Sequence, residues 1–372
     1  MTDYGDLTYD SAWEDSPIEK YFEYRSDHDN LTQERLYQLE ITIVESPDGA
    51  DYQSWDEYIA WREGMTVDDA LSFLSQLRSA GLAERTVEEK MVIVMSFVQH
   101  LYNRGVVDSN PVSYVVHEQD FEYQEKDKID LEVDEVGEYL SSISDLQYRG
   151  MGVLMGKSGI RIGEAINIDL IDLNIDDPSY DKILDEQGIT LHQEVAERPD
   201  SLYIPSEPTV GEKYRGEKRK AGNKRKRDTI IPLDDEANHA LMDWLAVRPP
   251  MAYPHPLWTG QTGQKRIGAS TISKRLTGKF AVQAGIIEDV FEEGFNPHWF
   301  RHFFSSNLTP GWGNYDEGDI APTKLKYLRG DVFSIGKTDE YGNDVLETYL
   351  HQWGDTIRED YLDAIYQFGL YD

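Results

Sequence analysis

Four polar side chains, met in this order along the chain, could carry out a phosphodiester transfer without a metal. Arg161 lies in Gly-Ile-Arg-Ile-Gly-Glu, His298 and Arg301 lie in His-Trp-Phe-Arg, and Tyr349 lies in Glu-Thr-Tyr-Leu-His. A planar guanidinium can hold two phosphate oxygens at once, and a histidine can exchange protons. A tyrosine hydroxyl can attack phosphorus. The set therefore indicates phosphoryl transfer to a tyrosine.

Two of these residues have a simpler explanation when each is taken alone. Arg161 and Glu164 have the i,i+3 spacing of a surface ion pair on a helix. His298 and His302 have the i,i+4 spacing of a zinc pair, but metallohydrolase helices usually carry Glu after the first His, and here Trp299 follows. The sequence therefore predicts no metal site.

Other tyrosines compete with Tyr349 for the role of nucleophile. The chain has 23 tyrosines, most of which must serve packing, and Tyr361 and Tyr366 lie close behind Tyr349. Only Tyr349 has a Thr before it and a His two residues after it. We therefore expect Tyr349 to be the nucleophile, with Tyr361 and Tyr366 as the alternatives.

Composition excludes several classes of site. The sequence has no cysteine, which rules out disulfides, thiolate catalysis and Cys-based zinc sites. Residues 1–15 are acidic and unlike a signal peptide. The longest mostly apolar stretch, Met91–Val98, is far shorter than the roughly 20 residues of a membrane span. We expect a soluble, cytoplasmic protein with no membrane partner.

The net charge of −34 needs its own explanation. Such a charge taken alone opposes a nucleic-acid partner, because DNA would be repelled. The content of 39% hydrophobic and 12% aromatic residues favours a folded chain over a disordered one. Acidic surfaces suit molar salt, where the Debye length is only about 3 Å. The charge is therefore typical of a halophile's protein.

One basic cluster interrupts this acidic chain. Between residues 213 and 227 there are nine basic residues, opposed only by Glu217. The cluster predicts a polyanion contact, and a flexible solvated loop is the alternative. Its members are Lys213, Arg215, Lys218, Arg219, Lys220, Lys224, Arg225, Lys226 and Arg227.

The first part of the chain, residues 16–112, is predicted to be a small helical bundle. A helix is expected at 32–44, and Thr66–Asp69 and Thr86–Glu89 both look like capping boxes before apolar residues at helical spacing. Gly105 is expected to end the second of these helices, and Asn110-Pro111 to close the bundle.

A polar linker at 113–130 separates this bundle from a mixed domain at 131–372. Helices are predicted at 133–142, 150–157, 236–247 and 271–284, and strands at 189–192, 202–205 and 229–233. Because the basic cluster falls between the last two of these strands, it should be the long connection of a β-hairpin.

Taken together, these motifs resemble the tyrosine recombinase (phage integrase) family, and in particular integrases of halophilic archaea and their mobile elements. The resemblance covers most of the chain and implies an α+β, mostly helical fold. It comprises an N-terminal helical core-binding (SAM-like) domain and a mixed α/β catalytic domain with a small antiparallel sheet. Arg161, His298, Arg301 and Tyr349 match the family motifs in order. His302 is also usual in the family motif, where it looks structural.

The resemblance also implies a catalytic lysine in the hairpin. Counting back from Pro232 points to Lys224, with Lys220 and Lys226 as alternatives because loop length varies. The rest of the cluster is expected to contact DNA, namely Lys218, Arg219, Lys220, Arg225, Lys226 and Arg227.

One position departs from the family pattern. The family usually places Gly-His or Gly-Trp before the nucleophile, whereas here Leu-Arg-Gly is followed by Asp331, and an insertion of about nine residues rich in Gly and Asp follows. An ionised aspartate cannot donate a hydrogen bond to phosphate. Asp331 should instead position Tyr349 or a basic partner, or His351 or Trp353 substitutes for it.

The resemblance thus implies a site-specific DNA recombinase that forms a 3′-phosphotyrosyl intermediate and needs no cofactor. Its partners would be double-stranded attachment sites, bound as a homotetramer on two duplexes, with a monomer or dimer when free. Two alternatives are a type IB topoisomerase-like enzyme, which shares the chemistry but acts as a monomer, and a non-catalytic DNA-binding module.

Overall fold

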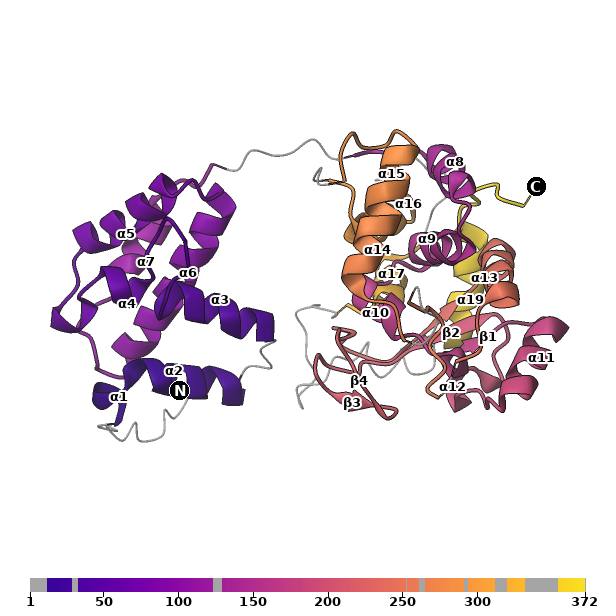
Figure 1. The fold of residues 1–372 in the computed structure, drawn as a ribbon, viewed down its shortest axis with the longest axis horizontal. Helices are drawn as coiled ribbons and strands as arrows, with labels where there is room; N and C mark the ends of the chain where they lie inside the picture. Colours follow the sequence, from indigo (N-terminus) through magenta and orange to yellow (C-terminus); the bar gives the residue numbers. More distant parts are fainter. Residues whose placement is uncertain are drawn as a thin grey trace. The chain divides into compact units, whose positions relative to one another are not determined.

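The computed structural model describes residues 12–28, 33–122, 129–251, 253–260, 265–290, 294–311, 320–331 and 354–371. The chain divides into two compact units, unit 1 (Met1–Glu125) and unit 2 (Lys126–Asp372) (Figure 1). Within the described ranges, no helix has the length and apolar character needed to cross a membrane.

Unit 1 is a helical bundle built around one long helix, α6. The buried face of α6 carries Val87, Met91, Val94 and Phe97 at helical spacing, and the other helices pack on it. Its elements are α1 (Ala12–Asp15), α2 (Pro17–His28), α3 (Gln33–Ile43), α4 (Trp55–Tyr58), a 3₁₀ turn (Trp61–Glu63), α5 (Val67–Ser79), α6 (Glu84–Asn103) and α7 (Pro111–Glu118).

The helix starts of unit 1 confirm one sequence prediction and correct two. Thr66 and Asp69 form the predicted capping box. The box predicted at Thr86 is wrong, because α6 already begins at Glu84, which pairs with Arg78 at 2.8 Å. The Asn110-Pro111 pair starts α7 instead of closing the bundle, since the Asn side chain caps the helix and Pro is favoured in a first turn. Helix α7 therefore occupies the start of the segment 113–130.

Unit 2 is mostly helical and centres on α9 (Leu146–Ser158), almost all of whose residues are buried. Helices α8 (Val133–Ser142), α13 (Asp235–Val247) and α16 (Pro297–Asn307) pack round it (Figure 1). Gly150 permits the close approach of α13, because a Cβ at this position would lie 2.9 Å from the Ala240 carbonyl oxygen. The remaining helices are α10 (Ile162–Asn167), a 3₁₀ turn (Leu170–Asp172), α11 (Pro178–Gln187), α12 (Gln193–Ala196), α14 (Ala269–Lys274), a π-helical turn (Arg275–Lys279), α15 (Phe280–Gln283), α17 (Pro322–Arg329) and α19 (Gly354–Ala364).

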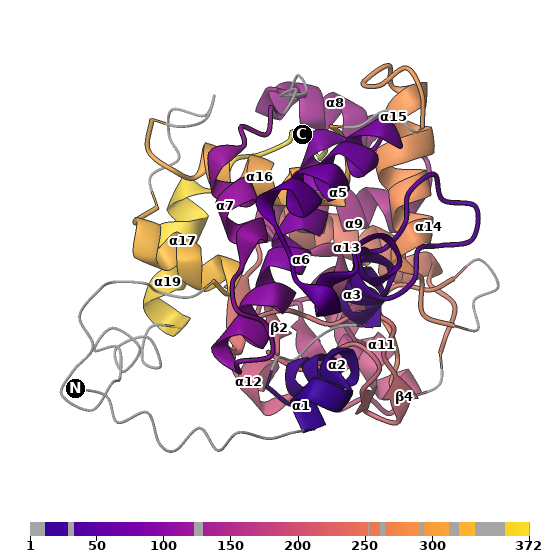
Figure 2. The same cartoon turned by 90° about the vertical axis from the view of Figure 1, so that its left-hand side faces the viewer.

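The sheet of unit 2 is small and antiparallel, in the order β1-β2-β5. Strands β2 (Ser201–Ile204) and β5 (Thr229–Pro232) form the predicted hairpin, with Leu202 opposite Ile231. The strand predicted at 189–192 is wrong, and β1 (Leu173–Asn174) takes the third place. The long connection holds a second hairpin, β3 (Lys213–Tyr214) with β4 (Glu217–Lys218). Helices α17 and α19 lie next to each other (Figure 2), and both pack against β5.

The last described residues fold back onto the core of their own unit. Both carboxylate oxygens of Glu236 accept backbone N–H groups, from Phe368 and Leu370 at 2.9 Å each. Lys157 is fully buried, pairs with Asp234 and Glu236, and donates to the Tyr366 carbonyl at 2.8 Å. The tail after α19 is therefore part of the core of unit 2.

Candidate active site

Arg161 is held at a sharp junction between two helices. Helix α9 ends at Gly159, whose φ of 61° is the left-handed conformation that favours glycine. Arg161 then caps the start of α10, and Glu164 accepts both its backbone N–H at 2.8 Å and its Nη1 at 3.0 Å. The ion pair expected from the spacing therefore exists, and it fixes the guanidinium in the site.

Arg301 reaches the same place from α16. Its side chain is 2% exposed, and Nη1 donates to the Gly159 carbonyl at 2.7 Å and to the Arg329 carbonyl at 3.1 Å. Burial, and then the adjacent positive charge of Arg161, lower the pKa of Arg301 to about 9, while Asp331 acts in the opposite direction. The guanidinium therefore remains charged at neutral pH.

The two arginines converge on one carboxylate oxygen. Oδ1 of Asp331 accepts from Arg301 Nη2 at 2.7 Å and from Arg161 Nη2 at 2.9 Å. Arg329 Nε lies 3.0 Å from the other oxygen. Side chains 140 residues apart in the sequence thus share one anion-binding point, which is the arrangement a phosphate oxygen would need.

Two members of the basic cluster are structural, in contrast to the sequence prediction. Arg225 is buried, with Nη2 on Glu164 at 3.2 Å and Nη1 on the Leu328 carbonyl at 3.0 Å. Arg219 is buried and pairs with Asp169 at 2.8 Å. A guanidinium in the interior cannot reach DNA, so the prediction of DNA contact is wrong for these two residues. Arg225 instead supports Arg161 through their shared partner, Glu164.

Lys224 lies between two anchored neighbours. Asn223 is buried and donates to the carbonyls of Pro205 at 2.8 Å and Glu207 at 2.7 Å, and Arg225 is buried on the other side. Lys224 itself is exposed and has a φ of 54°, a backbone conformation uncommon for residues other than glycine. The loop therefore holds the backbone of Lys224 in a strained conformation with the side chain accessible.

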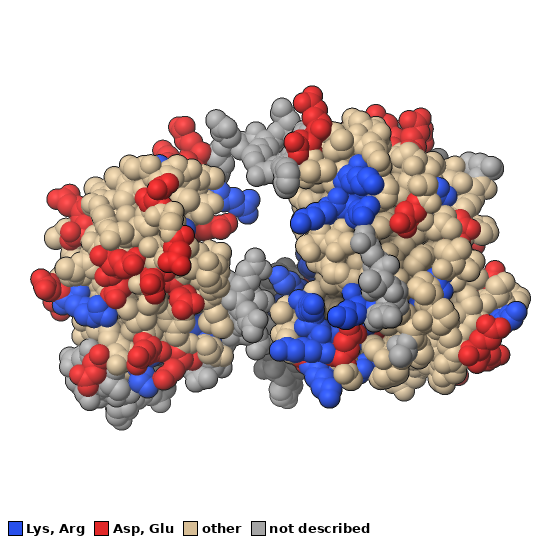
Figure 3. All heavy atoms as spheres, in the orientation of Figure 1, with Lys and Arg blue, Asp and Glu red and all other residues tan. Residues whose placement is uncertain are grey.

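The remaining predicted DNA contacts divide by exposure. Lys218, Lys220 and Lys226 are exposed, whereas Arg227 is half-buried and donates to the Asp331 carbonyl at 3.4 Å. On the face of unit 2 drawn in Figure 3, Lys and Arg gather in two groups, one over the β3–β4 hairpin and one over α14–α15.

Sequence reasoning missed the second of these groups. The segment from α14 to α15 carries exposed Lys274 and Lys279, with Arg275 between them. The sequence signal for this second group was three basic residues within one short helical stretch of an acidic chain. This signal is weaker than that of the nine basic residues at 213–227. The π-helical turn places them in a single, locally widened helix.

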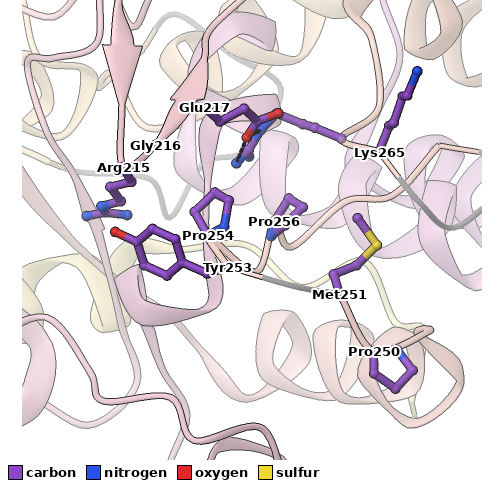
Figure 4. A pocket seen from close by; sticks show the side chains of 10 residues that line it. Arg215, Gly216, Glu217, Pro250, Met251, Tyr253, Pro254, Pro256 and Lys265 are labelled. Atoms are coloured by element: carbon purple, nitrogen blue, oxygen red, sulfur yellow. Dashed lines mark hydrogen bonds and ion pairs between the residues drawn. The ribbon is translucent and has the colours of Figure 1, made fainter.

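The β3–β4 hairpin is fixed by ion pairs, including pairs with the buried acids Asp169 and Asp172. Arg215 pairs with Asp172 at 2.6 Å and Asp169 at 3.0 Å, and Arg266 pairs with Glu217 at 3.0 Å. An open pocket of about 490 Å³ lies beside it, and none of its lining residues belongs to the predicted catalytic set (Figure 4). This part of the cluster is therefore ordered structure and differs from a loosely solvated loop.

His298 is the second residue of α16 and lies one turn before Arg301. Its ring is accessible and lies perpendicular to that of His302, with ring centroids 4.7 Å apart. Partial burial, then His302 and the nearby arginines, lower its pKa, so the ring is neutral at neutral pH. Among the described residues, no group of three or more His, Cys, Asp or Glu could hold a metal ion.

The alternative nucleophiles are packing residues. Tyr361 and Tyr366 are fully buried, and their hydroxyls donate to the carbonyls of Lys157 and Gly156. Burial raises the pKa of both well above the ordinary value. Neither hydroxyl can attack a phosphate from this position. Tyr349 lies outside the described residues, as do His351 and Trp353.

Comparisons with known proteins point to one family. The chain is 25% identical over 243 residues to the tyrosine recombinase XerC of Chromohalobacter salexigens, which covers 63% of this chain and 64% of that protein. It is 24% identical over 248 residues to XerC of Thermodesulfovibrio yellowstonii, covering 63% and 66%. Each match spans slightly less than two thirds of the relative. No protein-family model matches the chain.

Solved structures show the same fold. The Tn1549 transposon integrase, in complex with a circular intermediate DNA, aligns with a TM-score of 0.59 at 14% identity over 91% of this chain and 98% of that one. A lambda integrase tetramer bound to a Holliday junction aligns with a TM-score of 0.52 at 12% identity, over 88% and 79%. The fold is therefore that of tyrosine recombinases, as the sequence predicted, and the curated relatives support a place in the tyrosine recombinase/integrase family.

Proposed function

We propose that this protein is a site-specific DNA recombinase that cleaves and rejoins DNA through a 3′-phosphotyrosyl intermediate. The observation that carries the proposal is the convergence of Arg161 and Arg301 on one anionic oxygen. The two XerC relatives are tyrosine recombinases, and the Tn1549 structure is that of an integrase in complex with DNA. An attachment-site duplex would be the substrate.

In the proposed reaction, the Tyr349 oxygen attacks the scissile phosphorus and the bond to the 5′ oxygen breaks. Neutral His298 takes the phenolic proton, and Lys224 protonates the departing 5′ oxygen. Arg161 and Arg301 stabilise the charge that develops on the non-bridging oxygens, an electrostatic effect that is often the largest in catalysis. The phosphotyrosyl bond preserves the energy needed for rejoining, so neither a cofactor nor ATP is required.

The accessible lysines of the loop would hold the DNA backbone. Lys218, Lys220 and Lys226 are exposed, and Lys274 and Lys279 extend the basic surface over a second element. Exchange of strands would require a homotetramer on two duplexes, a proposal supported by the lambda integrase tetramer on a Holliday junction. The charge of −34 further supports a cytoplasm rich in salt, such as that of a halophile.

A type IB topoisomerase-like enzyme is the second candidate. The described C-terminal residues pack on their own unit, as a monomeric enzyme would require. Relaxation of supercoiled plasmid by the protein, without joining of two attachment sites, would favour this candidate.

The test is to trap the covalent complex on a suicide duplex, in which the short fragment that carries the newly formed 5′-hydroxyl diffuses away and cannot be rejoined. We expect a protein–DNA adduct that Tyr349→Phe abolishes while DNA binding is kept, because one hydroxyl is lost and no packing changes. Tyr366→Phe is the matched control, and it should still form the adduct. A normal adduct in Tyr349→Phe would contradict the assignment.

A further inference from the structure

Asp331 is fixed where its carboxylate meets both site arginines. Gly330 ends α17 with a φ of 65°, and the Asp331 N–H donates to the Lys326 carbonyl at 3.0 Å. A Cβ at residue 330 would lie 2.7 Å from Arg225 Cγ, so the turn packs tightly on a buried side chain. The position of the Asp331 carboxylate is therefore set by the end of α17, which holds the Asp331 backbone in place.

The contacts of Asp331 are those of a bound phosphate. A carboxylate oxygen and a non-bridging phosphate oxygen both accept from the same guanidinium N–H groups at the same distances. Oδ1 receives Nη2 of Arg161 at 2.9 Å and Nη2 of Arg301 at 2.7 Å. Two anions cannot share these donors, because like charges in direct contact repel strongly.

We infer that Asp331 competes with the scissile phosphate for Arg161 and Arg301, so that a phosphate binds only when the carboxylate gives up this position. The inference rests on the proposed function, since it assigns a phosphate to the two arginines. It gives the site selectivity. A small anion offers only the oxygens that displace Asp331, whereas a duplex also brings backbone contacts to the exposed lysines. Asp331 thereby keeps free anions out of the arginine pair.

The test uses inorganic phosphate as the probe, titrated into the full chain at constant KCl and pH and followed by ³¹P NMR and calorimetry. Asp331→Asn keeps the shape and one acceptor but removes the charge. We expect it to bind phosphate about tenfold more tightly than the natural protein or better. Asp363→Asn removes an exposed aspartate of α19 and is the matched control, which should leave phosphate affinity unchanged.

Two further arms identify the site and guard against misfolding. Arg161→Lys added to Asp331→Asn should remove the gain, which places the probe on the arginine pair. Asp331→Ser is measured beside Asp331→Asn in case one of them is unstable, and thermal unfolding checks both. Unchanged or weaker phosphate binding in a folded variant overturns the inference.

This result is separable from that of the proposed function, because phosphate titration involves neither DNA nor Tyr349. An adduct on the suicide duplex with no gain in phosphate affinity would refute the competition alone. A gain in phosphate affinity without any adduct would refute the recombinase and leave the anion competition in place.

Discussion

At the scale of single residues, the protonation of His298 decides whether it can accept a proton. Its ring lies among His302, Arg301 and Arg161, so positive charge surrounds it in addition to its partial burial. All of these lower the pKa of His298 from its ordinary value of 6.5. Neutral imidazole is thus the form present at neutral pH, as the proposed proton transfer to His298 requires.

The first prediction concerns the pH dependence of cleavage. Because the pKa of His298 is lowered, the midpoint of the decline in rate with falling pH should lie below 6.5. His302→Asn removes one neighbouring cause, so it should raise the pKa of His298 and move this decline to higher pH. Single-turnover cleavage against pH measures both. A decline already complete at 6.5 in the natural protein would contradict a neutral His298.

The second prediction concerns Lys224 as the acid. Lys224→Ala should slow cleavage by about 10²- to 10⁴-fold, the usual contribution of proton transfer. A duplex with sulfur in place of the bridging 5′ oxygen should restore the rate, because a thiolate leaves without a proton. Lys220→Ala and Lys226→Ala are the matched controls, each removing a nearby exposed lysine. Rescue by sulfur in Lys226→Ala alone would move the acid to Lys226.

At the scale of elements, the basic loop combines two roles that positive charge alone does not distinguish. Exposed lysines alternate with buried arginines, whose acids come from distant parts of the chain, Asp169 for Arg219 and Glu164 for Arg225. A buried guanidinium needs such a partner, so the arginines hold the loop in the shape that presents the lysines.

The third prediction distinguishes these roles. Arg225→Met removes one of the two cations that pair with buried Glu164 and leaves the Leu328 carbonyl without this donor, so it should destabilise the unit by about 3 kcal/mol. The melting temperature should then fall by about 5 °C or more. Lys220→Ala should weaken DNA binding with no change in melting temperature. Thermal unfolding and duplex titration in the same KCl concentration compare the two. Equal melting temperatures would show that Arg225 is dispensable for the fold.

The sequence predicted the elements better than the partners of the charges. The β2–β5 hairpin and helices α8 and α13 follow from local periodicity and are confirmed. The segment 189–192 looked like a strand because its residues alternate, yet it forms none, although the His192 N–H donates to the Ile171 carbonyl at 2.7 Å. The pairing of Asp331 with both arginines depends on how α10, α16 and α17 meet, which no local pattern records.

At the scale of the whole molecule, charge sets the response to salt. A typical DNA-binding protein loses affinity as salt rises, with a slope of about −0.9 per neutralised phosphate. Here basic groups cover parts of unit 2, but the chain carries a net charge of −34. At 0.1 M salt the Debye length is about 10 Å, so the acidic surface repels the duplex. Molar salt reduces this repulsion to contact range.

The fourth prediction is therefore a DNA affinity that is flat or rising with KCl up to molar concentrations. Short arginine–phosphate contacts are weakened less by salt than the long-range field. Duplex titration from 0.1 to about 2 M KCl, with circular dichroism to confirm folding at each point, makes the measurement. A steep negative slope between about 0.5 and 2 M would contradict this explanation of the charge.

The tail that follows α19 has a consequence for synthesis. Lys157 lies in the middle of the unit, yet it donates to the carbonyl of Tyr366, and Glu236 receives the N–H groups of Phe368 and Leu370. A nascent chain lacks these groups until residues 366–370 have been synthesised. The core of unit 2 is therefore completed late, and a chain that stops before residue 366 leaves Lys157 and Glu236 without these partners.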